Sequence, residues 1–303
     1  MRVALLSGGV GGARFARGLQ SVLEPGDLTV IGNVGDDVEV LGLHVSPDLD
    51  SIIYSLAGLH DEERGWGRAG ESWKALESAG AWGGENWFRL GDLDIGLHLV
   101  RTQALRAGEP LSAVTERLAD AAGLATRIVP ATDDRLRTTV VTPAGSFGFQ
   151  EWFVGRGHRD EVDDVRFEGA ESARAAPRVL HAIQDADAIL IAPSNPYVSI
   201  HPILAVREIR DAVASRTVRC VAVSPLVGGR AVKGPADRML SRMAGGTTSR
   251  HVAERYQALI DALVIDESDA AAEAGVATVV TRTLMTDLEA AARLAGVTLE
   301  AAR

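Results

Sequence analysis

The stretch Leu5–Phe15, "LLSGGVGGARF", decides the fold of this chain. It leaves an apolar run of strand length, Val3–Ser7, passes through four glycines and enters a segment with Phe15, Leu19 and Leu23 at helical spacing. A strand, a glycine turn and a helix in this order are typical of α/β sheets, where backbone N–H groups and the helix N-terminus bind phosphate. We therefore predict an α/β fold with a phosphate or nucleotide site at this turn.

The glycine turn matches neither of two familiar nucleotide-binding motifs. It lacks the Gly-Lys-Ser/Thr ending of a P-loop, and Arg14 stands where the dinucleotide fingerprint has Gly or Ala. Glycine nevertheless allows a ligand to approach the backbone closely, and Arg14 adds a positive charge. We predict that Gly9, Gly11 and Gly12 contact an anionic substrate. A plain turn between strand and helix is the alternative.

Six further apolar runs of strand length follow along the chain. They are nearly continuous rather than alternating, which is typical of strands buried on both faces of a parallel sheet. They lie at 28–33, 126–131, 188–194, 218–224, 262–267 and 277–282.

Helical patterns lie between these runs. They predict helices at 12–23, 92–108 and 286–296, the last opened by a Thr-x-x-Glu capping box and ended by a glycine. In the second, residues at helical spacing are Leu93, Leu97, Val100 and Leu105. The alternation of strand and helix predicts a doubly wound, mostly parallel, Rossmann-like sheet. We expect one α/β domain over 1–303, with a mostly helical subdomain over 49–125.

Two segments depart from this alternation. Residues 138–153 read as two strands joined by a Pro-Ala-Gly-Ser turn, which predicts an antiparallel β-hairpin. Residues 155–175 are charged and poor in apolar side chains, and we expect a solvated connection there. Four of the five tryptophans lie within 66–87. We expect most tryptophans to pack in the core, with stacking on a flat heterocycle as the alternative.

Composition excludes several classes of protein. The 303 residues carry 31 Lys and Arg against 41 Asp and Glu, a net charge of −10, which argues against a non-specific nucleic-acid binder. No apolar stretch reaches membrane-spanning length, and the start of the chain does not read as a signal peptide. We expect a soluble, cytoplasmic protein without nucleic-acid or membrane partners. The single cysteine, Cys220, should be a buried strand thiol.

The stretch Gly32–Ser51 brings four aspartates close to a predicted strand. Asp36 and Asp37 follow its carboxyl end, the edge where ligands bind in open α/β sheets. Asp48 and Asp50 precede a predicted helix, and either one could be its N-cap. Carboxylates beside a phosphate-binding turn predict a hard cation such as Mg²⁺. One of them could also accept a proton from an attacking hydroxyl.

Two later loops have the same design as the glycine turn. Ser194 and Asn195 follow the apolar run at 188–194, and Ser224 follows the run at 218–224, with Gly228 and Gly229 close behind. Small polar residues and glycines at strand ends predict a second anionic or nucleotide-binding surface on the same sheet, although plain turns are the alternative.

Together these motifs resemble one family, the 2-phospho-L-lactate transferases of coenzyme F-420 biosynthesis, which include an actinobacterial phosphoenolpyruvate transferase branch. The match runs in order from residue 1 to about 290. The segments that carry it are "SGGVGGARFARGL", "NVGDD", "SPDLDSIIYSLAG", "RGWG", "WFRLGDLDIGLHLVRTQALRAG", "FQEWFV", "APSNPYVSIHPIL", "VSPLVGGRAVKGPA" and "LMTD".

The resemblance implies a Mg²⁺-dependent transfer. A phospholactyl or phosphoenolpyruvyl group would pass from a guanosine-diphospho donor to the ribityl hydroxyl of the deazaflavin Fo, and GMP would leave. By the same implication Asp36, Asp48 and Asp50 hold Mg²⁺ or orient the hydroxyl, and Asp36 and Asp50 are catalytic. Asp50 and Arg89 occupy the positions that the family uses toward Fo. The glycine turn, Ser194, Asn195 and the 224–234 loop would surround the guanosine diphosphate, in a homodimer.

The choice of donor is open at this point. Some family members carry Lys in place of Arg89, and residues 155–175 match weakly. The Ala- and Arg-rich composition indicates an actinobacterial source, which favours the phosphoenolpyruvyl donor. We also expect that Asp50→Asn leaves the fold intact and lowers transfer at least about a hundredfold.

Two other functions compete with this interpretation. One is a non-catalytic, nucleotide-sugar-binding regulator of the same superfamily, which is disfavoured because such proteins carry a Pro-Pro-Gly-Asp style segment where this chain has Ser46–Asp50. The other is an NAD-dependent oxidoreductase with Asp36 or Asp37 on a ribose, which the broken fingerprint weakens.

Overall fold

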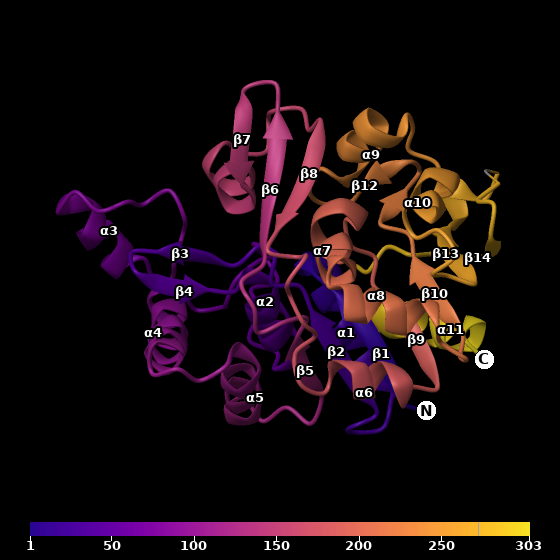
Figure 1. Ribbon diagram of the computed structural model, residues 1–303, viewed down its shortest axis with the longest axis horizontal. Helices are drawn as coiled ribbons and strands as arrows, with labels where there is room; N and C mark the ends of the chain where they lie inside the picture. Colours follow the sequence, from indigo (N-terminus) through magenta and orange to yellow (C-terminus); the bar gives the residue numbers. More distant parts are fainter. Residues whose placement is uncertain (272) are drawn as a thin grey trace.

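The computed structural model describes residues 1–271 and 273–303. A seven-stranded sheet forms its centre, in the order β14-β13-β10-β9-β1-β2-β5 (Figure 1). Each neighbouring pair in this sheet is parallel. The strands are β1 (Val3–Ser7), β2 (Leu28–Gly32), β5 (Arg127–Pro130), β9 (Ala188–Ile191), β10 (Cys220–Val223), β13 (Ala262–Asp266) and β14 (Ala277–Thr281). These are the seven apolar runs of the sequence, so the predicted α/β sheet is confirmed.

Helices cover both faces of the sheet (Figure 1). On one face α1 packs against α2 and α11, and on the other α6, α7 and α8 pack together. The helices are α1 (Gly9–Val22), α2 (Pro47–Leu56), α3 (Lys74–Ala81), α4 (Asp92–Arg106), α5 (Leu111–Ala121), α6 (Val179–Gln184), α7 (His201–Ala205), α8 (Arg207–Ala214), α9 (Ala236–Ala244), α10 (Ser249–Arg255) and α11 (Leu288–Ala301).

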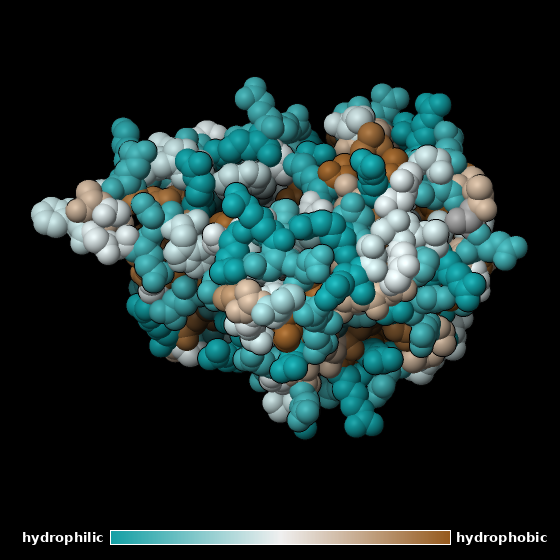
Figure 2. Space-filling model, turned by 90° about the horizontal axis from the view of Figure 1, so that it is seen from above, coloured by the Kyte–Doolittle hydropathy of each residue, from teal (hydrophilic) through white to brown (hydrophobic). Residues whose placement is uncertain are grey.

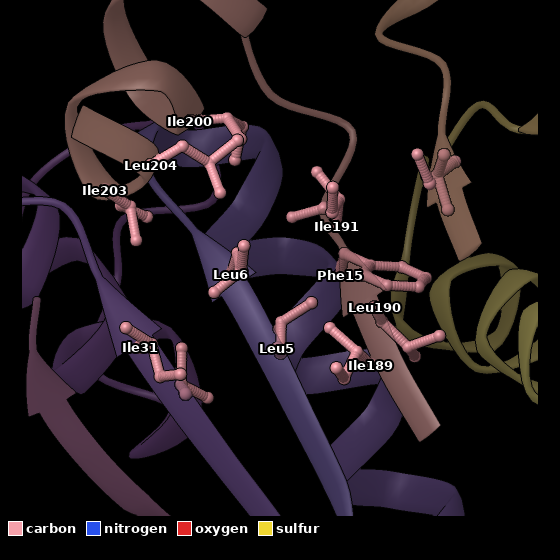
Figure 3. Close-up of a cluster of buried hydrophobic side chains, with 14 of the residues drawn as sticks. Leu5, Leu6, Phe15, Ile31, Ile189, Leu190, Ile191, Ile200, Ile203 and Leu204 are labelled. Atoms are coloured by element: carbon pink, nitrogen blue, oxygen red, sulfur yellow. The ribbon is translucent and has the colours of Figure 1, made fainter. Parts of the chain in front are cut away.

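The core lies between the helices and the sheet. Every residue of β1, β2, β9, β10 and β13 is buried, including Cys220 as predicted. In Figure 3, Leu5, Leu190 and Ile31 extend from three neighbouring strands, with Phe15 of α1 and Ile203 of α7 among the side chains around them. Burial of apolar surface stabilises the sheet on both faces, by roughly 25 cal/mol per Å² buried. The loops at its carboxyl edge are therefore anchored in a well-packed sheet.

Two predicted helix ends are wrong. The helix expected at 286–296 has Asp287 as its N-cap, whose carboxylate accepts a hydrogen bond from the Ala290 N–H at 2.8 Å. The expected Thr-x-x-Glu capping box placed the N-cap one residue too early, at Thr286. Asp287 takes that position, because Asp is at least as good an N-cap residue as Thr. The helix also continues through Gly296 to Ala301, since the core on α1 holds it there.

The region after β5 forms a separate antiparallel sheet. The predicted hairpin is confirmed as β6 (Arg137–Thr142) and β7 (Gly145–Gly148). A third strand, β8 (Asp164–Glu168), pairs with the other side of β6, so the expectation of a solvated connection over 155–175 is wrong there. Its sequence "DVRFE" alternates charged and apolar residues, which is the signal of a half-buried strand. A π-helical turn, η1 (Glu151–Gly155), follows β7.

Residues 49–125 are mostly helical, as their pattern indicates. α2 packs on α1, whereas α3 and α4 extend to one side of the molecule with a small hairpin of β3 (Val38–Val40) and β4 (Leu43–Val45) (Figure 1). The turn of this hairpin has positive φ at Leu41 and Gly42, as two-residue hairpin turns require. These elements form a wall beside the carboxyl edge of the sheet.

Candidate active site

The carboxyl edge of the central sheet opens into a cavity of about 670 Å³. The strand order reverses between β1 and β9, and open α/β sheets bind ligands at such a switch point. The volume suits a bound small molecule. Figure 2 shows the molecule from the side toward which these strands point, with hydrophobic areas scattered among mostly hydrophilic residues. The loops that follow β1, β2, β9 and β10 therefore meet at one edge of the sheet, as the sequence predicted.

Nine of the residues expected in the site lie on the wall of this cavity. They are Gly9, Gly11, Asp36, Asp48, Asp50, Arg89, Ser194, Asn195 and Ser224.

Three glycines expected to contact substrate lie elsewhere, which corrects their assignment. A side chain at Gly12 would collide with the hydroxyl of Ser7, so this glycine serves close packing of the turn. The backbone N–H groups of Gly228 and Gly229 donate to the carboxylate of Asp269 at 3.0 and 2.8 Å. These donors hold the loop after β10 in shape and are already engaged.

The glycine turn presents the N-terminus of α1 to the cavity. Gly9 has φ +69°, and its N–H donates to Asp48 Oδ1 at 2.7 Å. The half-buried Arg14 and the exposed Lys233, in the loop after β12 (Arg230–Ala231), also line the cavity here, and Lys233 Nζ donates to the carbonyl of Gly65 at 3.2 Å. Burial, with the charge of Arg14, lowers the pKa of Lys233. A helix N-terminus and two cations favour an anionic ligand here.

Gly11→Ala is expected to weaken binding of a nucleoside diphosphate by about 10- to 100-fold, which is the effect of losing a hydrogen bond to a charged group. A Cβ at Gly11 would lie 2.7 Å from the backbone carbonyl of Pro193, so the turn would have to move away from the loop after β9. Isothermal calorimetry with GDP measures the effect.

The control for this substitution is Gly296→Ala in α11, where no atom lies within 4 Å of the added Cβ. It should leave binding unchanged and raise stability by about 0.5–1 kcal/mol, because alanine favours helix more than glycine does. Unchanged affinity of the Gly11→Ala protein would contradict the phosphate-binding role of the turn.

The four aspartates of Gly32–Ser51 are all buried. Asp37 does not line the cavity, because its Oδ2 accepts from the Ser46 hydroxyl at 2.9 Å and lies 2.9 Å from His44 Nε2. The expectation that Asp48 or Asp50 caps α2 is wrong, since Ser46 is the N-cap residue and both carboxylates lie in the first turn. One acid therefore stabilises the hairpin beside α2, and three face the cavity.

Asp36 and Asp48 form an unneutralised pair of acids. Burial, with the charge of Asp48, raises the pKa of Asp36 well above its usual value. Burial also raises the pKa of Asp48 to about 6, although hydrogen bonds from Asn33 (2.9 Å) and Gly9 (2.7 Å) favour its charged form. Asp36 Oδ1 has no hydrogen-bond partner among the described residues. Two such carboxylates beside a phosphate site suit a cation.

Asp50 has a different environment, because the fully buried Arg101 of α4 donates to both of its oxygens. The bond from Arg101 Nη1 to Asp50 Oδ2 is 3.0 Å long. His98 Nδ1 lies 3.3 Å from the same guanidinium nitrogen, and burial lowers the pKa of His98 to about 4. At neutral pH the imidazole is therefore uncharged, and Arg101 is the cation that forms an ion pair with Asp50.

Sequence reasoning missed Arg101. Leucine and valine at helical spacing ordinarily mark the buried face of a helix, but Leu93 and Val100 of the predicted pattern are 42% and 47% exposed. The inward face carries Asp94, His98 and Arg101, at intervals of four and three residues. The sequence did contain a signal for this inward face, because these three polar residues recur at helical spacing.

Aromatic side chains also line the cavity. They include Trp66, Phe88 and Phe153, and the guanidinium of Arg89 lies 4.7 Å from the centre of the Trp73 ring. The expectation that most tryptophans pack in the core is wrong. Among the five only Trp152 is buried, and Trp82 is 89% exposed. The exposed rings lie in the segment that extends beside the sheet, where a flat heterocycle could stack.

A parallel sheet with a glycine turn, cations and acids at its switch point is typical of α/β proteins that bind phosphorylated small molecules. The family model described as "2-phospho-L-lactate transferase CofD" matches residues 3–299. The chain belongs to this family, and it is accordingly a transferase of coenzyme F-420 biosynthesis.

Curated relatives of similar length bear one name, phosphoenolpyruvate transferase. The protein of Streptomyces coelicolor is 46% identical, with 97% of this chain and 96% of that chain covered. Those of Thermobifida fusca and Mycobacterium sp. (strain KMS) are 45% and 41% identical, covering 100% and 99% of this chain and 98% and 100% of theirs.

A solved structure from Bacillus halodurans, of a UPF0052 family member, has a TM-score of 0.65 over 98% of both chains. At 16% identity this likeness shows the fold alone. Within residues 1–271 and 273–303, no helix has the length and apolar character needed to cross a membrane.

Proposed function

We propose that this protein transfers a phosphoenolpyruvyl or phospholactyl group from a guanosine-diphospho donor to the ribityl hydroxyl of the deazaflavin Fo. The hydroxyl oxygen attacks the phosphorus that bears the small acid, the bond to the bridging oxygen breaks, and GMP leaves. The name of the relatives favours the phosphoenolpyruvyl donor. The observation that carries the proposal is one cavity lined by the glycine turn, by buried acids and by aromatic side chains.

The donor suits the end of the cavity above β1, β9 and β10. The N-terminus of α1, Arg14 and Lys233 face the diphosphate there, and Asn195 and Ser224 line the adjoining wall. Ser194 donates its hydroxyl to the carbonyl of Gly8 at 2.6 Å, which ties the loop after β9 to the glycine turn. The nucleoside therefore lies over loops whose relative positions are fixed by direct bonds.

Asp36 and Asp48 would hold Mg²⁺, which would neutralise charge on the donor diphosphate. In the described part of the chain no three His, Cys, Asp or Glu side chains are placed to hold a metal together. Two carboxylates still suit Mg²⁺, which is commonly bound by one or two carboxylates with substrate phosphates and water. Asp50 fits this set less well than the sequence indicated, because both its oxygens accept from Arg101.

The acceptor suits the part of the cavity that Phe88, Leu90 and the first turns of α4 line. Its flat ring system would stack near Trp66 and Phe88, with Arg89 at the rim, and its hydroxyl chain would reach Asp50 toward the glycine turn. Phosphoryl transfer depends mainly on such positioning and on neutralising charge. Aromatic walls also exclude water, which would otherwise compete with the hydroxyl for phosphorus.

Incubation with Fo, Mg²⁺ and each guanosine-diphospho donor tests the function, with products identified by mass. A phosphodiester of Fo together with GMP is the expected result, and EDTA should abolish it. If neither donor yields this product while the protein binds a nucleotide sugar, the regulator function replaces the proposal. We also propose a cytoplasmic homodimer, and light scattering of the purified protein measures its oligomeric state.

A further inference from the structure

Two facing rows of polar side chains from α2 and α4 lie on the wall of the cavity. Asp50 and Tyr54 are one turn apart on α2, and Asp94 and His98 are one turn apart on α4. All four line the cavity. The ion pair between Asp50 and Arg101 holds the two helices in this arrangement.

Within these rows, one carboxylate oxygen of Asp94 and the hydroxyl of Tyr54 are not satisfied by ordinary hydrogen bonds. Their residues are only 8% and 3% exposed. Neither Asp94 Oδ1 nor the Tyr54 hydroxyl makes a hydrogen bond of ordinary geometry to any described residue, and only a weak hydrogen bond between the two side chains contributes to the pKa of each. The backbone N–H of Asp94, by contrast, donates to Glu71 at 2.9 Å. The atoms that lack ordinary hydrogen bonds are therefore in the two side chains.

Unpartnered buried polar atoms are uncommon in folded proteins, and each costs about 1–3 kcal/mol. On a cavity wall, a ligand can supply the missing bond. A phosphate is excluded as that ligand, because Asp94 is itself an acid and lies near two others: burial, and then the charges of Glu71 and Asp50, raise its pKa. A neutral O–H or N–H donor suits a carboxylate in this place.

We propose that Asp94 and Tyr54 form a binding subsite for hydrogen-bond donors of the acceptor molecule. Asp94 accepts a hydrogen bond from a hydroxyl or ring N–H of the acceptor, and the Tyr54 hydroxyl bonds the adjacent polar atom. The inference rests on the proposed function, since it assigns this part of the cavity to Fo. It predicts that the two residues select the acceptor and leave donor binding unaffected.

The test compares Asp94→Asn and Tyr54→Phe with the unaltered protein. Binding of Fo is followed by its fluorescence with GDP and Mg²⁺ present, and binding of GDP by calorimetry. Each variant should weaken Fo binding about 10- to 100-fold, the fold-change of a lost hydrogen bond to a charged group. The KM for Fo should rise more than kcat falls, and GDP affinity should stay within about twofold.

The control is Asp120→Asn, at an exposed acid of α5, which should change neither affinity. Wild-type affinity for Fo in both variants would overturn the subsite and leave the transferase function standing. An equal loss of GDP and Fo binding would also overturn it, because that pattern reports a disturbed fold. Failure of the unaltered protein to bind Fo would overturn the transferase function and the subsite together.

Discussion

Asp50→Asn should both destabilise the protein and reduce transfer by at least about a hundredfold, within the range of single groups that act at a reacting centre. The substitution removes the counter-charge of Arg101, which is fully buried in α4. Removing one partner of a buried ion pair costs about 3–5 kcal/mol, because the other charge is left uncompensated. This corrects the expectation from the sequence that the fold would be left intact.

Thermal melting and Fo transfer, measured on the same preparation, separate the two effects. The matched control is the double variant Asp50→Asn with Arg101→Met, which removes both charges. It should recover much of the lost stability, as replacement of buried ion pairs by apolar groups often does, but no transfer. A single variant that melts like the unaltered protein would contradict the structural role of the pair. Recovery of transfer in the double variant would contradict the role of Asp50 in the reaction.

Asp36→Asn should have the opposite effect on stability while also abolishing transfer. The pKa of Asp36 is raised in the fold by burial and by Asp48, so the charged form is disfavoured at neutral pH. A neutral isostere removes that cost and should stabilise the ligand-free protein by about 1–3 kcal/mol. Transfer should fall by at least about a hundredfold, because a group that balances charge in the reaction is lost.

The pH dependence gives the check on this prediction. A folded-state pKa above the unfolded value means that the folded protein binds the proton more tightly. Ionisation of Asp36 therefore destabilises the protein at neutral pH, and this cost begins to decline as pH falls through the raised pKa and is gone below the ordinary pKa of an aspartate. The melting temperatures of the two proteins should differ at about pH 7 and converge in acid. A lower melting temperature of Asp36→Asn at neutral pH would contradict the prediction, because it would mean that the fold stabilises the Asp36 carboxylate.

The central sheet could be predicted because its signal is local. Strands of a parallel sheet are buried on both faces, and their apolar runs are visible without knowledge of their neighbours. α4 shows where that logic fails. Its inward face borders a polar cavity, so the row with Asp94 and Arg101 is buried while Leu99 and Val100 are exposed. Hydrophobic periodicity identifies the buried face only when the interior is apolar.

The candidate site was only partly predictable for a related reason. Asp36, Ser194 and Ser224 follow strands, and the topology of an α/β sheet brings strand ends together whatever the details of the loops. The pairing of Asp50 with Arg101 spans 51 positions and depends on how α4 is placed against α2, which no local pattern specifies. The sequence also did not reveal the conformation of the loop after β10. There the N–H groups of Gly228 and Gly229 bond to Asp269 and are not free to bind a ligand.

The bond from the Gly9 N–H to Asp48 has a consequence for the order in which ligands arrive. In the protein without ligands, a carboxylate already occupies one donor at the α1 N-terminus, and its charge repels a free nucleotide from the helix end. A cation on Asp48 would remove that repulsion, so each ligand should strengthen binding of the other by the same factor. The nucleotide would then bind together with the cation that neutralises its charge. Depletion of the cation alone would be enough to prevent nucleotide binding.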